Sequence, residues 1–465
     1  MRLLPIVAAA GLLAGCVSFT PDGGFGTVDS AVRERTGQEA KWIRSETEGD
    51  SVRARVKELL AQPLSAENAV QVALLNNPGL QASYAEMGIA EADLVQASRW
   101  RGPTFSFARL RRGDETEFER SVFLDVLGLI SIPLATKAQE KRFEAAKARA
   151  AGEALRLALE TRKSYFGAVA AAETVRYMDQ VKDAAEASAE LARRMAAVGN
   201  WPRLNHQREQ VFYAETAAQL ARAKQAQVAS RERLTRSMGL WGEELNFTLP
   251  ERLPDLPKTP REPGGLEAQA LAERLDVQGA RRESEALAES MGLTRVTRFV
   301  DLLEVGLHHN TESPRPPQRG WEVELRIPIF DFGGARVARA EHVYMQSVNR
   351  AAETAIRARS EVRESYSAYR TAFDLARHYR DEIVPLRKRI SEEMLLRYNG
   401  MLSSVFELLV DARETVISVN AYIESLRDFW LTESDLQAAL TTGSPGAPAG
   451  SMRPTAGPAS APANH

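Results

Sequence analysis

The sequence predicts an α+β protein made of two internal repeats, each with one very long helix, flanking helices and two strands. The first observation is a segment from Leu134 to Val198 that contains no proline and is rich in Ala, Glu, Arg, Lys and Leu, which are strong helix formers. The second is a similar segment from Ala335 to Arg397. The third is that both segments follow an apolar Ile-Pro stretch and end at a glycine, Gly199 or Gly400. Such self-similarity indicates a repeat architecture.

Composition excludes several classes of function. The 465 residues would suffice for several domains, but the repeat favours one elongated body with two similar halves. Charge is nearly balanced, with 60 Lys and Arg against 62 Asp and Glu, so a nucleic-acid partner is not expected. The single cysteine excludes an intrachain disulfide and a thiol-rich metal site.

Residues 1–16 are predicted to be a lipoprotein signal peptide. Arg2 precedes an apolar run, and the run closes with the tetrapeptide Leu13–Cys16. This tetrapeptide resembles the bacterial lipobox, whose cysteine is acylated, so Cys16 is the predicted lipidation site. An ordinary secretory signal with a chance cysteine is the alternative. Residues 17–64 are expected to be an extended tether arm with one short helix, Ser51–Ala61.

Residues 65–240 form the first predicted repeat. Ser65 is placed to cap a helix, and Pro78 is expected to break that helix. The elements predicted here are a helix over Glu67–Arg101, strands over Thr104–Leu110 and Phe118–Ile132, the long helix from Leu134, a turn at Gly199–Pro202 and a helix over Arg203–Gly239.

Residues 241–264 form a proline-rich connector, and residues 265–440 form the second predicted repeat. Its second strand is the clearest in the chain, because apolar and charged residues alternate from Trp321. The elements predicted here are a helix over 265–298, strands over Asp301–His309 and Trp321–Phe330, the long helix from Ala335 and a helix from Ser403 to Leu440. Residues 441–465 are expected to be a disordered tail.

The helix lengths and the strand number together suggest an assembly. Each long helix is about as long as its two flanking helices laid end to end, which predicts a rod with the strands at one end and the glycine turns at the other. No run of 18 or more apolar residues follows residue 16, so no transmembrane helix is expected. A closed barrel needs about eight strands or more. Several copies must therefore contribute four strands each, and three copies would supply twelve.

Four motifs resemble the TolC-like outer membrane efflux proteins, in the lipoprotein branch of that family. They occur in the family's order and in duplicate: Ala69–Leu80, Arg274–Arg281, Ile327–Gly334 and Arg397–Gly400. The resemblance implies a homotrimer with a long antiparallel α-helical coiled-coil barrel and a 12-stranded transmembrane β-barrel in the outer membrane. It also implies binding of outer membrane lipid, a periplasmic adaptor protein and an inner membrane pump.

The resemblance also assigns candidate site residues. Glu407 and Asp411 lie where family members carry carboxylates at the periplasmic aperture, and Asn205 holds the matching place in the first half. A solvated helix pair is the alternative for the two acids. The adaptor-docking tips would comprise Gly199, Trp201, Gly400 and Ser403. Trp201 has the alternative role of packing its own turn.

The remaining candidate residues give weaker indications of function. His308 and His309 are adjacent in a predicted strand and face opposite ways, so they cannot chelate one metal ion together. Asp125 would face a lumen if Val122, Leu124 and Val126 face lipid. No catalytic set, phosphate loop or zinc spacing occurs, so neither an enzyme nor a cofactor is expected.

The predicted function is a passive outer membrane conduit of a tripartite efflux or type I secretion system. The alternative is a periplasmic coiled-coil adaptor or scaffold lipoprotein without pore activity.

Overall fold

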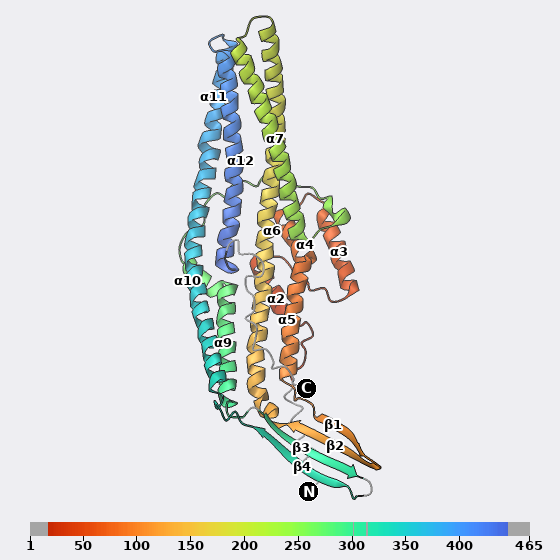
Figure 1. Cartoon of the computed structure of the whole chain (residues 1–465). Helices are drawn as coiled ribbons and strands as arrows, with labels where there is room; N and C mark the ends of the chain where they lie inside the picture. Colours follow the sequence, from red (N-terminus) through yellow and green to blue (C-terminus); the bar gives the residue numbers. More distant parts are fainter. Residues whose placement is uncertain (1–16, 301, 313–314, 445–465) are drawn as a thin grey trace. The chain divides into compact units, whose positions relative to one another are not determined.

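The computed structural model describes residues 17–300, 302–312 and 315–444, so Cys16 and most of the predicted tail lie outside the described residues. The described chain is mostly helical and carries one small antiparallel sheet (Figure 1). It divides into two compact units. Unit 1 holds the described residues up to Ser30 together with Ala82–Ala151 and Leu275–Arg357. Unit 2 holds Ala31–Gln81, Gly152–Arg274 and the described residues from Ala358 onward.

Unit 1 contains the sheet. Its strands are β1 (Thr104–Arg112), β2 (Glu115–Asp125), β3 (Leu302–Glu312) and β4 (Gln318–Arg326), paired antiparallel in the order β1-β2-β3-β4. All four predicted strands are therefore present. The prediction that β2 runs to Ile132 is wrong, because helix α6 (Val126–Ala197) begins directly after Asp125 and includes Pro133. The prediction that β4 runs to Phe330 is also wrong, because it ends at Arg326.

An N-cap explains the early start of α6. The Asp125 carboxylate accepts a hydrogen bond from the Gly128 amide at 2.7 Å, which satisfies one of the free N–H groups in the first helical turn. A Cβ at Gly128 would lie 2.3 Å from Asp125 Oδ2, so any other residue at this position would have to displace the capping carboxylate. The β-branched residues that follow suggest a strand by propensity alone, but the cap overrides that weak preference.

The second long helix is interrupted, which the sequence analysis did not predict. It consists of α10 (Gly334–His378), the π-helical segment η2 (Tyr379–Ile383) and α11 (Val384–Asn399). Pro385 lies two residues beyond the end of the π segment. Its ring has no N–H and crowds the carbonyl of Asp381, four residues earlier. The wider π turn accommodates this residue.

Both first flanking helices are split. In the first half α4 (Ala66–Asn76) and α5 (Pro78–Ala97) are separated at Asn77, and the Ser65 hydroxyl accepts from the Asn68 amide at 3.1 Å. The predicted cap and the predicted break are confirmed. In the second half a single helix over 265–298 was expected, but α8 (Leu266–Glu273) and α9 (Leu275–Val296) are separated at Arg274. No proline marks that break, so the sequence pattern missed it.

The segment before Ser65 is more helical than expected. Helices α2 (Phe25–Thr36) and α3 (Glu46–Leu60) replace the single predicted helix Ser51–Ala61. Three glycines near the start of α2 lower its helix propensity. The Asp22 carboxylate compensates, because it accepts from the amides of Gly24 and Gly26 at 3.1 and 2.7 Å.

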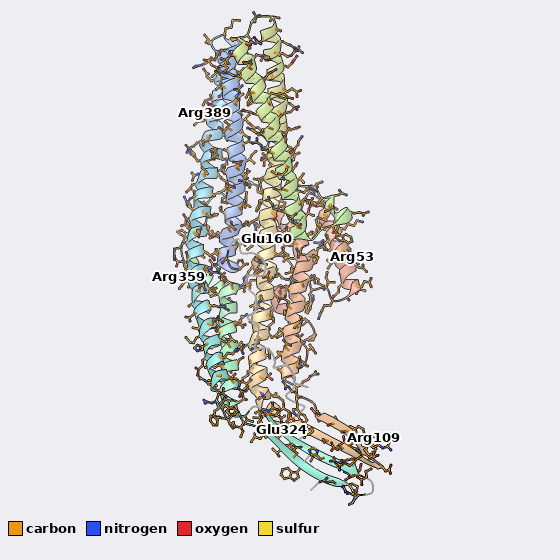
Figure 2. All side chains as sticks on the ribbon, viewed as in Figure 1. Arg53, Arg109, Glu160, Glu324, Arg359 and Arg389 are labelled. Atoms are coloured by element: carbon orange, nitrogen blue, oxygen red, sulfur yellow. The ribbon has the colours of Figure 1, made fainter. Side chains whose placement is uncertain are left out.

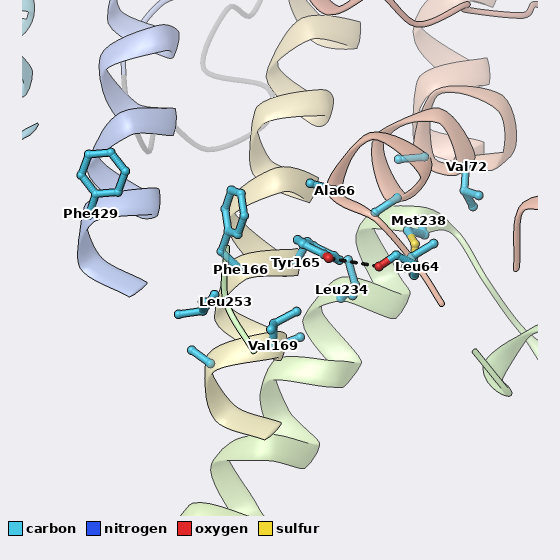
Figure 3. Close-up of a cluster of buried hydrophobic side chains, with 14 of the residues drawn as sticks. Leu64, Ala66, Val72, Tyr165, Phe166, Val169, Leu234, Met238, Leu253 and Phe429 are labelled. Carbon is cyan, nitrogen blue, oxygen red and sulfur yellow. Dashed lines mark hydrogen bonds between the residues drawn. The ribbon is translucent and has the colours of Figure 1, made fainter. Parts of the chain in front are cut away.

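The core of unit 2 is a continuous cluster of buried side chains from α3, α4, α6, α7 (Arg203–Met238), α10 and α12 (Val405–Thr441). The Tyr165 hydroxyl on α6 donates to the Leu64 carbonyl at 3.0 Å (Figure 3). The proline-rich connector has only the short helix η1 (Gly242–Leu245). It still contributes buried Phe247, Leu253 and Leu256 to the cluster.

Charged side chains extend from all elements of both units, among them Arg359 on α10, Arg389 on α11 and Glu324 on β4 (Figure 2). In the part of the chain that the structure describes, no helix combines the length and the apolar character needed to cross a membrane.

Candidate functional site

The two faces of the sheet differ in chemistry. The register places Phe105, Val122, Leu307 and Trp321 side by side across all four strands. Because side chains alternate along a strand, this face also carries Phe107, Val323 and Leu325. The large side chains on it are exposed, with 74 % of Phe105 and 76 % of Trp321 accessible. An apolar sheet face left uncovered within one chain indicates a surface for another apolar environment.

The opposite face is acidic. Asp125, Glu304 and Glu324 lie on one line across β2, β3 and β4. Like charges that lie directly opposite in a sheet repel each other and are destabilising. The same face also carries Glu117, Glu119, Glu312 and Glu322. The arrangement can attract cations to this side of the sheet.

A hydrogen-bond chain crosses the acidic face. Ser121 Oγ lies 2.8 Å from His308 Nδ1, and His308 Nε2 lies 2.7 Å from Glu322 Oε2. The chain ties β2, β3 and β4 together. Sequence reasoning missed it because the register between strands cannot be read from the sequence. Among the described residues, no group of three or more His, Cys, Asp or Glu side chains is placed to hold a metal ion.

Asp125 lies at the end of β2 on the acidic face, and its carboxylate caps α6 as described above. Strand alternation predicted that Asp125 would face a lumen if Val122, Leu124 and Val126 face lipid, but Val126 is the first residue of α6 and not part of the strand. The structure adds a second, local role for this side chain, since its Oδ1 is engaged by the Gly128 amide.

The helical end of unit 2 carries two hairpin turns (Figure 1). Between α6 and α7, Gly199 adopts φ +77° and the Asn200 amide donates to the Met195 carbonyl at 3.0 Å. Trp201 is partly buried, and its indole Nε1 is buried without a hydrogen-bond partner among the described residues. The Asn205 amide donates to the Pro202 carbonyl at 3.0 Å in the first turn of α7.

Between α11 and α12, the left-handed residue is Met401 with φ 56°, whereas Gly400 has φ −81°. The Leu402 amide closes the turn by donating to the Arg397 carbonyl at 2.8 Å. Met401 and Leu402 are 94 % and 82 % exposed. An exposed apolar pair at the tip of a hairpin is typical of a contact surface.

Glu407 lies at the start of α12 in a capping box. Its Oε2 accepts from Ser403 Oγ at 2.6 Å and from the Ser404 amide at 2.8 Å, while Ser404 Oγ accepts from the Glu407 amide at 3.2 Å. The Ser403 hydroxyl, followed by the Ser404 amide, lowers the pKa of Glu407 below its ordinary value. Glu407 therefore holds its negative charge at the tip.

Asp411 has a different environment one turn further along α12. It is buried, and its Oδ2 accepts from Ser391 Oγ on α11 at 2.5 Å. Ser391 is also 3.2 Å from the Thr415 hydroxyl. Within one chain Asp411 thus joins α11 to α12, and Glu407 remains exposed to solvent.

A buried ion pair that the sequence analysis missed lies near the same end. Glu209 on α7 is nearly fully buried, and Arg413 Nη2 on α12 lies 2.5 Å from its carboxylate. Ser188 Oγ on α6 donates to Glu209 at 2.8 Å. The guanidinium of Arg413 also stacks over Phe212, with its Cζ atom 4.4 Å from the ring centroid. These contacts join the two hairpins within unit 2.

The fold matches solved structures of outer membrane channels, although no protein-family model and no curated protein sequence matches the chain. It is similar to the CmeC outer membrane channel of Campylobacter jejuni, with a TM-score of 0.69, 16 % identity and coverage of 82 % of this chain and 87 % of that one. It is also similar to the outer membrane channel OprN, with a TM-score of 0.68, 15 % identity and coverage of 89 % and 95 %.

A third similar structure is the open state of the MtrE outer membrane channel of Neisseria gonorrhoeae, with a TM-score of 0.66, 16 % identity and coverage of 81 % and 89 %. These matches confirm the TolC-like fold that the sequence motifs predicted. The chain is mostly helical with a small antiparallel sheet, as that fold requires.

Proposed function

We propose that this chain is one protomer of an outer membrane channel that acts as a passive conduit for export. The observation that carries the proposal is the sheet: one face is apolar and exposed, the other is acidic, and both outer strands have a free edge. Among the described residues β1 pairs only with β2, and β4 pairs only with β3. A strand edge in lipid must be paired, so another copy of the sheet is required.

Three copies complete the channel. The strands are 9 to 11 residues long, which suits a tilted strand that spans the hydrocarbon core. Three sheets supply twelve strands in a barrel closed by β1–β4 contacts between neighbouring copies. The Phe105–Trp321 line faces lipid and the Asp125–Glu324 line faces the lumen. Carboxylates that line a lumen favour cations.

The protein is anchored in the outer membrane through acylated Cys16. The Thr20 amide and hydroxyl both donate to Glu91 Oε1 on α5, at 2.7 and 2.6 Å. Thr20 is four positions after Cys16, so the Cα atom that carries the acylated side chain can lie no more than about 14 Å from this point on unit 1, which also holds the sheet. Two or more acyl chains are sufficient for a stable anchor.

The hairpin tips dock a periplasmic adaptor and an inner membrane pump, which supply the energy. Gly199 and Trp201 form one tip, and Gly400 and Ser403 form the other. The exposed Met401 and Leu402 support a docking role for the second tip.

Glu407, Asp411 and Asn205 line the periplasmic aperture. The exposed carboxylate of Glu407 is the most suitable for this role, because rings of like charges in a narrow opening repel one another and select cations. Asp411 contributes by fixing α11 against α12 through Ser391.

Planar-bilayer conductance of the purified protein tests the channel. We expect stepwise, cation-selective currents, and Glu322→Gln with Glu324→Gln should reduce the cation preference. We also propose that Glu407 helps to keep the aperture closed, so Glu407→Gln should raise the conductance. Glutamine preserves the capping box while removing the charge. Arg389→Gln, on α11, is the control for charge removal elsewhere. A protein that binds lipid but passes no ions, even with Glu407→Gln and Asp411→Asn combined, would be the scaffold alternative.

A further inference from the structure

A cavity of about 440 Å³ lies on unit 2, beside the C-terminal half of α12. Its volume is in the range of ordinary ligand pockets. Aromatic side chains and prolines form its walls, which is the composition of grooves that bind extended proline-rich chain. The lining residues that matter are Pro257, Pro260, Tyr369, Phe429, Trp430 and Glu433.

The aromatic wall already holds one proline-rich segment, the connector. Trp430 Nε1 donates to the Pro254 carbonyl at 3.0 Å. The Arg261 amide donates to the Tyr369 hydroxyl at 3.0 Å, and the Tyr366 hydroxyl donates to the Arg261 carbonyl at 3.3 Å. Aromatic donors and acceptors of this kind hold extended backbone that makes no hydrogen bonds of its own. These hydrogen bonds hold the connector in place as one wall of the cavity, opposite the aromatic side chains.

Glu433 gives the cavity an acidic side chain with one unsatisfied oxygen. Its Oε2 is buried and has no hydrogen-bond partner among the described residues. Arg261 lines the same cavity, but no ion pair joins it to Glu433 in the described part of the chain. A buried carboxylate oxygen without a hydrogen-bond donor costs free energy. A cationic group that donates a hydrogen bond to this oxygen would remove that cost.

We propose that the segment 445–465 of this chain docks in the cavity, with Arg453 paired to Glu433. The segment has five prolines, and Arg453 is its only Lys or Arg. Pro454 follows Arg453 directly and favours an extended backbone there. Both the shape and the charge of the cavity thus match what this segment carries.

The residue before this segment, Ser444, lies close enough to Glu433 for Arg453 to reach it. Ser444 Oγ donates to Glu361 Oε1 at 2.5 Å, which holds the chain beside the end of α12. Glu433 lies eight residues before the last residue of α12, or about 12 Å along the helix. The nine residues 445–453 can span about 28 Å as a polyproline II helix. Arg453 can therefore turn back along α12 and reach Glu433.

A photo-crosslinking amino acid in place of Met452, in the full-length purified protein, tests the contact. We expect crosslinks to peptides that contain Trp430–Leu436 or Pro257–Arg261, identified by mass spectrometry. Glu433→Arg should lower the yield at least tenfold, and the charge swap Glu433→Arg with Arg453→Glu should restore it. Glu424→Arg, at an exposed position on the same helix, is the matched control and should leave the yield unchanged.

Two results would overturn the proposal. One is a crosslink pattern that Glu433→Arg does not change while circular dichroism shows intact helices. The other is crosslinking between copies, detected by mixing isotopically heavy and light protein, because it would assign the cavity to a neighbouring chain. Neither result bears on the channel proposal, which is read out by conductance.

Discussion

The two halves of the chain use different side chains to hold the same kind of joint. In the first half, the break between α4 and α5 lies against the end of α7. Asn76 Nδ2 donates to the Gly239 carbonyl at 3.0 Å, and Asn77 Nδ2 donates to the Ser237 carbonyl at 2.9 Å. In the second half, the break between α8 and α9 lies against the end of α12, where Arg274 Nη1 donates to the Ala439 carbonyl at 3.4 Å.

The backbone at the two breaks is nearly the same, with φ −73° and ψ 117° at Asn77 and φ −62° and ψ 125° at Arg274. In both halves a side-chain donor therefore satisfies carbonyls that a helix C-terminus leaves free. The difference is charge. Neutral amides serve the first joint, whereas the second uses a fully buried guanidinium that also pairs with Glu361 at 2.9 Å. A cation suits a helix C-terminus, and its burial means that this joint contains a charge held away from water.

Substitution of Arg274 should produce the largest effect. Arg274→Met leaves the Glu361 carboxylate without its buried partner, and we expect a loss of about 3–5 kcal/mol in the free energy of unfolding. Asn77→Ala removes neutral hydrogen bonds only, so about 1–3 kcal/mol should be lost. Chemical denaturation followed by far-ultraviolet circular dichroism measures both.

The double variant Arg274→Met with Glu361→Leu separates charge from packing. It removes both partners, so most of the lost stability should return. If Arg274→Met and Asn77→Ala lowered the free energy of unfolding by the same amount, charge would not distinguish the two joints.

The glycine at the first joint should give the next largest effect. Gly239 has φ +69°, and a Cβ there would lie 2.9 Å from the Asn76 carbonyl oxygen. Gly239→Ala should cost about 1–2 kcal/mol for the left-handed backbone and a further amount for this contact.

Gly265→Ala is the matched control for Gly239→Ala. Gly265 has φ +78° and nothing within 4 Å of its Cβ position, so only the backbone cost applies. Thermal unfolding of the two variants compares them. An equal decrease in both would mean that the close approach of Asn76 to Gly239 contributes nothing to the first joint.

The difference between the joints also shows what a sequence can reveal. The break at Asn77 was predictable because Pro78 marks it locally, and the same holds for the turns at Gly199 and Gly400. The break at Arg274 carries no local mark, since it arises from a guanidinium that contacts Glu361 and Ala439, far away in the chain. Arg274 was noted only as the first residue of the motif Arg274–Arg281, and its role depends on its burial.

In the candidate sites, too, locally marked features were predictable and features that depend on distant contacts were not. Helix and strand periodicity predicted the elements, including the four strands and the alternation in β4. It did not predict the Ser121–His308–Glu322 chain or the Glu209–Arg413 pair, because both depend on contacts between distant segments. The capping box at Ser404 and Glu407 is local, with the spacing of a known cap signature. That signal was present in the sequence and was not used.

The two tips extend the comparison and should show the smallest effect. Helix α12 begins with a side-chain capping box, whereas α7 begins at Pro202 with no side-chain cap bond. The pKa of Glu407 is lowered in the folded protein. The stability that the ionised Glu407 gives to the first turn of α12 is therefore fully present above the ordinary carboxyl pKa. It is lost as the pH falls through the lowered pKa of the folded protein.

We expect the first turn of α12 to fray in acid while the first turn of α7 does not. Amide hydrogen exchange between pH 6 and pH 3, corrected for the intrinsic rate, should accelerate at residues 404–408 below about pH 4. Residues 203–207 should show no such change. Glu407→Gln keeps an acceptor for the Ser404 amide but does not titrate, so the acid dependence should disappear. If it persists in that variant, another group controls the start of α12, and the two tips do not differ through Glu407.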